Sequence, residues 1–304
     1  MGGMTVALLG EKGYGRKVGK KGSESDITLY NLKSSENVVT SIEPSAYPEK
    51  MAPLSYVLSM SDLVVFVVDR LDRHSGELLL AIDSMEKTRG IFVGGDRSAI
   101  GEIVRGTCAE RFEFLSDDIS LREKLLAMSS EVNKIEGNGA VVVDGAFKVK
   151  GVGTVVLGVV TRGCVRRHDA LNILPDGGKV QIRSIQKQDV NCDRAYTGDR
   201  VGLALRGAEP ENVGRGSVLT SDALECSREL EISMEKSTFF RGEVRDGSTV
   251  HVGHWMQFIQ GKIEGNRISL EKPMVVERGE NLFVCQLNSS IPRIMGRCVV
   301  MDNI

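Results

Sequence analysis

The chain has 304 residues, of which 41% are hydrophobic and 26% are charged, and its formal net charge is −2. This composition excludes wholesale disorder, and the near-neutral charge means that any case for nucleic-acid binding must rest on local basic patches. The longest purely apolar run, Leu63–Val68, is far shorter than the roughly 18 residues that suggest a membrane span. No basic segment precedes the first apolar run, so we expect neither secretion nor a membrane partner.

The cysteines point to a reducing compartment. The six are scattered and none forms a CxxC pair, so they are typical of reduced thiols rather than of a disulfide framework or a zinc site. We therefore expect a cytoplasmic protein without a metal. The cysteines are Cys108, Cys164, Cys192, Cys226, Cys285 and Cys298.

Residues 1–136 alternate between apolar runs and segments with helical periodicity. Such alternation predicts an α/β domain with a parallel sheet. The run Leu63–Asp69 is continuously apolar up to its last residue, as expected of a strand buried on both faces. The other expected strands are Thr5–Leu9, Ile27–Leu32, Val38–Ile42, Gly90–Val93 and Phe112–Leu115, and the expected helices are Glu77–Lys87, Ile100–Arg105 and Leu121–Ser129.

The pattern changes at a linker around Ile135–Gly139. From there, short runs rich in valine, isoleucine and leucine alternate with DG, RG and PDGG turns, and a second break falls near Ser221–Glu225. Regular short strands separated by turns are typical of small closed barrels. The sequence thus predicts an α/β domain at 1–136, a β-barrel at 139–222 and a second β-barrel at 223–304.

Three blocks in the middle segment carry a family resemblance. They are Phe147–Gly158 (FKVKGVGTVVLG), Gly198–Gly207 (GDRVGLALRG) and Gly214–Leu219 (GRGSVL). In this order they resemble the second domain of translation elongation factor Tu and its relatives, and Arg183–Gln186 (RSIQ) is similar to selenocysteine-specific elongation factors. The resemblance implies a P-loop GTPase-like α/β domain, here markedly short, followed by two β-barrels.

The first nucleotide motif of that family is altered here. The family has GxxxxGK[ST], in which backbone N–H groups and the lysine bind phosphates and the hydroxyl binds Mg²⁺. This chain has Gly10-Glu-Lys-Gly-Tyr-Gly15-Arg16-Lys17. The glycine spacing is retained, but Arg16 replaces the lysine and Lys17 replaces the hydroxyl residue. Because an ammonium group cannot coordinate Mg²⁺, we expect the loop to have lost its magnesium ligand.

The two other nucleotide motifs are also absent. Where the family has DxxG, the chain has Ile42–Ala46 (IEPSA), and where it has the guanine-reading NKxD, the chain has Val93–Asp96 (VGGD). We therefore predict a degenerate domain that is not an enzyme and needs no cofactor, with GTP or GDP plus Mg as the alternative. Any residual nucleotide site would consist of Gly10, Gly15, Arg16, Lys17 and Asp96.

Two further patterns leave alternatives open. Five basic residues lie between Lys12 and Lys21 with no acidic residue among them; they could contact RNA phosphates or form a solvated, mobile loop. His251 and His254 are three residues apart, which puts them on opposite faces of a strand. We expect turn or surface histidines there rather than a metal site.

The resemblance also implies a pocket for the 3′ end and aminoacyl group of tRNA. Thr154 matches a barrel strand near the tRNA end and the ribosomal contact, and Gln186 stands where elongation factor Tu has an acidic residue near the terminal adenosine. A basic rim is expected from Thr161–Gly163 and Arg166–His168. The candidate residues for binding tRNA or the ribosome are Phe147, Thr154, Gln186, Leu205 and Arg206.

The sequence thus favours an elongation factor-like protein that does not hydrolyse GTP and that binds tRNA or a ribosomal element. One alternative is a divergent GTP-binding translation factor with residual GTPase activity. The other is a scaffold whose barrels dock a protein partner.

Overall fold

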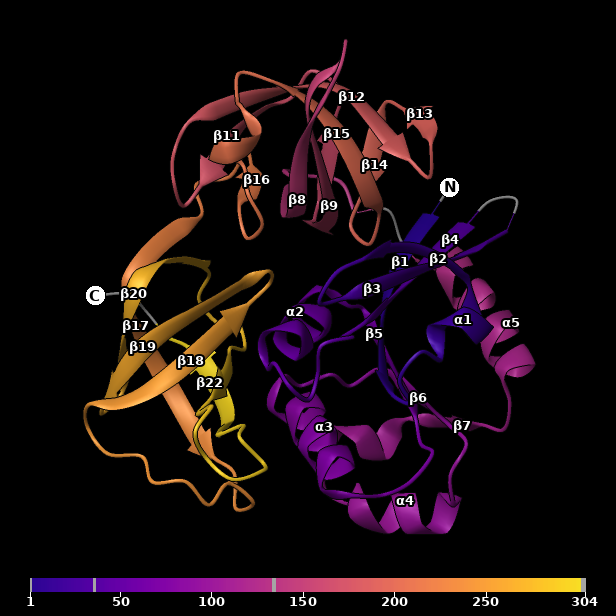
Figure 1. The fold of residues 1–304 in the computed structure, drawn as a ribbon, viewed down its shortest axis with the longest axis vertical. Coiled ribbons are helices and arrows are strands. Elements are labelled where there is room, and N and C mark those ends of the chain that lie inside the picture. Colours follow the sequence, from indigo (N-terminus) through magenta and orange to yellow (C-terminus); the bar gives the residue numbers. More distant parts are fainter. Residues whose placement is uncertain (1, 35–36, 133–134, 302–304) are drawn as a thin grey trace.

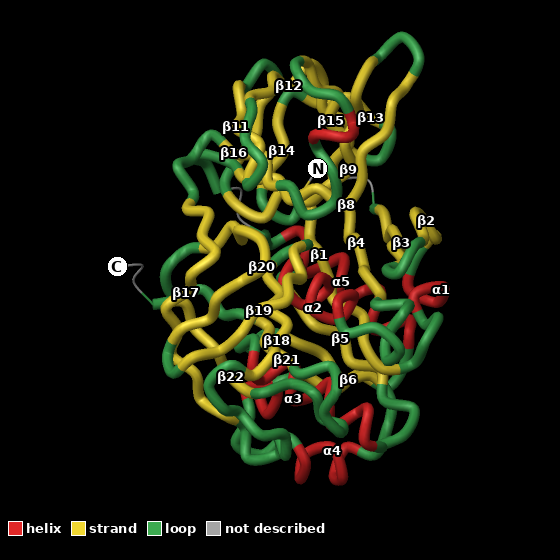
Figure 2. The backbone as a smooth tube through the Cα atoms, turned by 60° about the vertical axis from the view of Figure 1, so that its left-hand side comes forward, coloured by secondary structure: helices red, strands yellow, loops and turns green. Residues whose placement is uncertain are grey.

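The computed structural model describes residues 2–34, 37–132 and 135–301. An α/β domain, a middle barrel and a C-terminal barrel lie at the corners of a triangle, so that each contacts the other two (Figure 1). Helices gather around the sheet of the first domain, whereas the barrels consist of strands and loops apart from a 3-10 turn at Pro210–Asn212 (Figure 2).

The α/β sheet is mixed rather than parallel throughout. Strands β4, β1, β5, β6 and β7 run parallel in that order, and beyond β4 the sheet continues through two antiparallel pairs, β4 with β3 and β3 with β2. The short connections between β2, β3 and β4 leave no room for the crossover that parallel strands require. The bounds are β1 Gly2–Gly10, β2 Lys20–Glu24, β3 Thr28–Lys33, β4 Asn37–Glu43, β5 Leu63–Val67, β6 Gly90–Val93 and β7 Glu113–Leu115.

Three predicted helices exist but begin three or four residues earlier than expected. They are α3 Arg73–Ser84, α4 Arg97–Ile103 and α5 Asp118–Ser130, and each follows an aspartate that accepts backbone hydrogen bonds as its N-cap. Apolar periodicity detects the core-facing residues of a helix but not its polar first turn. In the part of the chain that the structure describes, none of the helices is long and apolar enough to cross a membrane.

Helix α2, Ala52–Met60, was not predicted, and its burial explains why. The helix contacts strand β1 of the sheet and β18 of the C-terminal barrel, so apolar residues occupy more than one of its faces. Such a helix lacks the alternation of apolar and polar faces on which prediction depends. The remaining helix, α1, is a single turn at Gly15–Val18.

The middle barrel is closed by six strands. Their order is β11-β16-β8-β9-β15-β12, and β12 pairs back onto β11. Inward-facing valine, leucine and isoleucine side chains fill the interior. The bounds are β8 Ala140–Val149, β9 Gly153–Arg162, β11 Ala170–Leu174, β12 Lys179–Lys187, β15 Arg200–Arg206 and β16 Val218–Thr220, with the short strands β10 Cys164–Arg166, β13 Val190–Cys192 and β14 Arg194–Tyr196 beside them.

The C-terminal barrel is nearly closed by six strands in the order β21-β18-β19-β20-β17-β22. Isolated bridges such as that between Cys285 and Ile294 help to bring its two ends together. The bounds are β17 Glu225–Lys236, β18 Ser248–His254, β19 Gln257–Glu264, β20 Arg267–Val276, β21 Phe283–Cys285 and β22 Gly296–Val300.

The two histidines of β18 have packing roles, which corrects the expectation of turn or surface histidines. His254 is buried, with Nε2 3.0 Å from a carboxylate oxygen of Glu280, and His251 stacks on the ring of Phe258. Among the described residues no group of three or more potential ligands could hold a metal ion.

The C-terminal barrel shares a hydrophobic core with the α/β domain. Trp255 and Phe283 of the barrel belong to the same buried cluster as Leu54 of α2. Beside it, the carboxylate of Glu77 on α3 is fully buried and accepts hydrogen bonds from the Arg293 guanidinium at 2.7 and 3.1 Å. The barrel is therefore joined to the α/β domain by direct contacts between buried side chains.

The middle barrel meets the α/β domain over its first strand and its edge hairpin. Gly198 lies so close to Gly3 that a Cβ atom on it would stand 2.6 Å from the Gly3 carbonyl oxygen. Nearby, Arg215 forms an ion pair with Asp26, with Nη1 2.6 Å from Oδ1. These contacts fix the barrel beside strands β1 and β3.

Candidate functional site

The glycines of the first loop are required by close packing. Gly10 has φ +96°, and a Cβ atom there would lie 1.9 Å from the carbonyl oxygen of Val67. A Cβ atom on Gly15 would lie 2.1 Å from the ring of Tyr30. The two glycines that match the spacing of a phosphate-binding loop are therefore also the residues that must pack closely against β5 and β3.

A carboxylate of the protein itself occupies the loop. Glu43, at the end of β4, accepts a hydrogen bond from the Gly13 N–H and is only 5% exposed. Burial raises the pKa of the neighbouring Tyr30 hydroxyl, and the charge of Glu43 raises it further. A phosphate entering this loop would meet a buried negative charge, and like charges at such a distance oppose one another strongly.

The cationic residues of the first motif lie on α1. Arg16 is exposed and faces an open cavity, whereas Lys17 lies 3.4 Å from Glu11 and over the ring of Tyr14. Because α1 is a single turn, it offers little of the N-terminal dipole that attracts phosphate to a longer helix.

Asp96 is separated from this loop. It follows β6, and the sheet places β5 between β6 and β1. Its carboxylate accepts a 2.8 Å hydrogen bond from the Ala99 N–H and so caps α4. The predicted nucleotide-binding residues thus have three different roles. Gly10 and Gly15 permit close packing, Arg16 and Lys17 are cations on α1, and Asp96 caps α4.

The basic run of residues 12–21 is not an irregular loop. It contains α1 and the start of β2, and β2 is held by pairing of Lys20 with Asn31 and of Lys21 with Tyr30. The alternative of a solvated, mobile loop is therefore wrong for the backbone, although the basic side chains are exposed. Strand pairing was invisible in the sequence because KKGSE has no apolar residue.

Three of the predicted tRNA-binding residues lie together in the middle barrel. Thr154 on β9 pairs with Leu205 on β15, and both line an open cavity of about 410 Å³ with Arg206. Thr154 and Leu205 are each only 3% exposed, and the Thr154 hydroxyl donates a 2.7 Å hydrogen bond to the Ala208 carbonyl. Arg206 is the member of this trio that faces solvent.

The other two predicted residues lie apart from that cavity. Phe147 is 43% exposed on the β8–β9 hairpin, which projects from the barrel (Figure 1). Gln186 lines a second cavity of about 280 Å³, shared with Leu29 and Asn31 of the α/β domain, and its side chain donates a 3.0 Å hydrogen bond to Asn191.

Sequence reasoning missed two basic residues of the 410 Å³ cavity, Lys148 and Arg183. Lys148 pairs with Thr154 across β8 and β9, so a correct strand register would have found it. Arg183 comes from β12, where a register shift occurs between Ile182 and Ser184, and alternation along the strand alone could not place it.

The expected basic rim is largely neutralised within the chain. Arg162 contacts both Glu277 and Asp222, and Arg166 contacts Glu136 with its Nη2 2.5 Å from Oε2. These arginines tie the middle barrel to neighbouring segments, so their charge is less available to a ligand than that of Arg183 or Arg206.

An α/β domain followed by a closed and a nearly closed barrel is the architecture of elongation factors of the Tu type. The family model for elongation factor Tu domain 2 matches residues 153–220, and the resemblance to this family is thereby confirmed. The chain belongs to the same family as the uncharacterized protein MJ0325 of Methanocaldococcus jannaschii. The two are 35% identical over 306 residues, which cover 97% of this chain and 99% of that protein.

Selenocysteine-specific elongation factors are also similar, over part of their length. The factor of M. jannaschii is 30% identical over 232 residues, covering 67% of this chain, which spans about half (49%) of that factor. Elongation factor SelB of Methanococcus maripaludis, solved with the GTP analogue GppNHp, superposes with a TM-score of 0.84 at 18% identity, covering 99% of this chain and 79% of that one. A bacterial selenocysteine-specific factor superposes at 0.79 with 19% identity, over 99% of this chain and 58% of that one. These likenesses define the fold.

Proposed function

We propose that this protein binds tRNA or a ribosomal element through its middle barrel and acts as an elongation factor-like protein without hydrolysing GTP. The observation that carries the proposal is the 410 Å³ cavity, in which Arg183 and Arg206 stand beside Val152, an exposed apolar residue of the β8–β9 hairpin. The elongation factor relatives are translation factors by name, which supports the same assignment.

The chemistry of this cavity suits a nucleic-acid ligand. Lys148 is paired with Glu209 at 2.7 Å, but Arg183 and Arg206 form no ion pair within the described ranges 2–34, 37–132 and 135–301. Arg183 donates a 2.8 Å hydrogen bond to the Val152 carbonyl, so its guanidinium is held against the hairpin. Guanidinium groups bind phosphates. On the same hairpin but outside the cavity, Phe147 offers an exposed ring of the kind that stacks on unpaired bases.

The first loop does not fit a magnesium–nucleotide complex, which supports a role without GTP hydrolysis. Magnesium takes oxygen ligands, and Lys17 has none to offer at the position of the family's hydroxyl. The Gly13 N–H, a donor of the kind that binds phosphate, is already bound to the carboxylate of Glu43. In this proposal the α/β domain is a scaffold that positions the barrels.

Buried contacts between the domains agree with a factor that has no nucleotide switch. In GTPases the γ-phosphate and its magnesium order the switch loops. Here the shared core around Trp255 and the buried pair of Glu77 and Arg293 join the C-terminal barrel to the α/β domain directly through side chains. Binding and release of RNA would then depend on concentration or on a partner.

The test is equilibrium binding of a fluorescein-labelled tRNA, and of ribosomes by sedimentation, without nucleotide. We expect the double variant Arg183→Gln/Arg206→Gln to bind more weakly and its salt slope to decrease by about 2, one for each lost phosphate contact. The control is Lys262→Gln/Lys272→Gln, which removes two exposed charges from the C-terminal barrel.

Equal losses in the two double variants would contradict a specific role of the cavity. If the wild type binds neither tRNA nor ribosomes, the proposed function is wrong. A stable protein partner recovered from the same preparations would then favour the scaffold alternative.

A further inference from the structure

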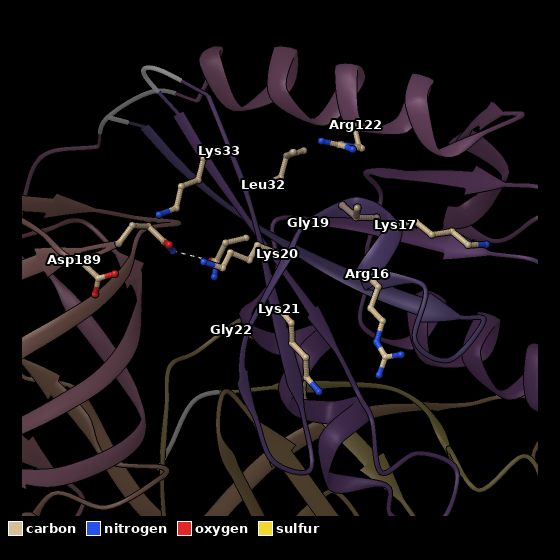
Figure 3. A pocket seen from close by; sticks show the side chains of 13 residues that line it. Arg16, Lys17, Gly19, Lys20, Lys21, Gly22, Leu32, Lys33, Arg122 and Asp189 are labelled. Carbon is tan, nitrogen blue, oxygen red and sulfur yellow. Dashed lines mark hydrogen bonds between the residues drawn. The ribbon is translucent and has the colours of Figure 1, made fainter.

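We propose that the free edge of the α/β sheet binds the phosphate backbone of RNA. The site is an open cavity of about 670 Å³ bounded by α1, β2, β3, α5 and the Gln188–Asp189 turn of the middle barrel. The inference rests on the proposed function because its ligand is RNA, but it concerns a different surface. The basic residues that line this edge cavity are Arg16, Lys17, Lys20, Lys21, Lys33 and Arg122 (Figure 3).

Most of this charge is not cancelled within the chain. Lys17 lies 3.4 Å from Glu11, and Lys21 lies 2.6 Å from Glu24. The other four cations form no ion pair among the residues that the structure describes, and Asp189 is the one acidic residue of the described lining. Several uncompensated cations around one open cavity create a local positive potential that the overall charge of −2 conceals.

The cations surround the edge strand on both of its faces. Lys20 pairs with Asn31, two residues before Lys33 on β3, so Lys20 and Lys33 share one face of the hairpin. Lys21 pairs with Tyr30 and therefore faces the other side. In Figure 3, Lys17 points away from Lys20 and Lys33, which makes it the member least directed at a shared ligand.

Protection of the sheet edge does not account for this cluster. Lysines on an edge strand prevent association with other strands, which would explain Lys20 and Lys21 on β2. It does not explain Lys33 on the inner strand β3 or Arg122 on α5. Basic side chains from α1, β2, β3 and α5 gather along this edge, which favours an extended anionic ligand.

The lining favours an RNA backbone over bases or a protein. Among the described lining residues none is aromatic, so bases have no platform on which to stack. The apolar members, Val18 and Leu32, are only 1% and 5% exposed, so the surface lacks the apolar centre of a typical protein interface. Ammonium groups bind phosphates as point charges and read no sequence.

The experiment compares Lys20→Gln/Lys33→Gln/Arg122→Gln with the Lys262→Gln/Lys272→Gln control in binding of a labelled tRNA transcript over a salt series. If three phosphate contacts are lost, the slope of log K against log salt should decrease by about 2 to 3. All three side chains are exposed, so we expect unchanged thermal unfolding. In the wild type, RNA should also protect Lys20 and Lys33 from acetylation, as read by mass spectrometry.

Three other outcomes overturn the inference. If the triple variant keeps the wild-type slope while Arg183→Gln/Arg206→Gln loses affinity, the edge cavity has no role but the barrel site stands. If the wild type binds no RNA, the inference is wrong, whereas the proposed function fails only if ribosomes do not bind either. Competition by polyglutamate as effective as that by RNA would assign the edge to an acidic protein.

Discussion

Replacing Arg293 by methionine tests how firmly the C-terminal barrel is joined to the α/β domain. The Arg293 side chain is 13% exposed. Its guanidinium donates hydrogen bonds to both carboxylate oxygens of the fully buried Glu77, and to the Pro48 carbonyl at 3.0 Å. Methionine keeps the aliphatic stem but leaves Glu77 with the Tyr47 hydroxyl and the backbone N–H of residue 293. Because removing one partner strands a buried charge, we expect a loss of about 3 to 5 kcal/mol in the free energy of unfolding.

The effect should depend on pH. Burial alone would raise the pKa of Glu77, but the hydrogen bonds and charge of Arg293 outweigh it and hold the pKa below its ordinary value of 4.5. A lowered folded-state pKa gives stability that is present above 4.5 and lost as pH falls through the folded-state value. In Arg293→Met burial dominates and raises that pKa, so the variant gains stability on acidification. The difference in the free energy of unfolding between Arg293→Met and the wild type should therefore shrink below about pH 5.

Urea unfolding monitored by the fluorescence of Trp255 is the assay. This residue is the only tryptophan of the chain, and it lies in the core shared by the two domains. Arg162→Met is the matched control, because Arg162 also joins two domains, here the two barrels, but is 40% exposed, and we expect it to cost at most about 1 kcal/mol. The reasoning would be refuted if Arg293→Met lost less than about 1 kcal/mol in the free energy of unfolding, or if its difference from the wild type did not depend on pH.

Further predictions concern packing and the first loop. Gly253→Ala places a Cβ atom 1.9 Å from the Ser55 hydroxyl oxygen at the same junction, and it should cost about 1 to 3 kcal/mol by urea unfolding; no loss would mean that α2 can shift. Gly76→Ala, in α3 with open space around its Cβ position, should instead stabilise by about 0.5 to 1 kcal/mol. Millimolar Mg·GTP or Mg·GDP should leave the melting temperature unchanged, whereas binding at 100 times the dissociation constant would add about 2.7 kcal/mol.

Sequence patterns predicted the helices that are buried on one face and the strands that are buried on both. The run at Leu63–Val67 was predicted as a buried strand, and its side chains alternate between two hydrophobic clusters on opposite faces of the sheet. Helix α2 escaped prediction because it packs between the sheet and a barrel, and β2 because its order comes from pairing with β3 rather than from burial. In both cases tertiary contacts determine the local structure.

The candidate sites show the same limit. Glu43 was noticed as a departure from a motif, but its contact with Gly13 depends on β4 lying next to β1. The basic run was evident in the sequence, yet Lys33 and Arg122 join it only through the sheet and α5. The sequence shows which residues carry suitable side chains, whereas only the fold shows which of them lie together.

The most direct test of the central claim is binding of tRNA and of ribosomes to the wild-type protein, measured first with all nucleotide removed and then with saturating Mg·GTP. The account predicts binding without nucleotide and the same dissociation constant in both conditions. Binding that appears only with Mg·GTP would contradict it and would assign the protein to the nucleotide-dependent factors.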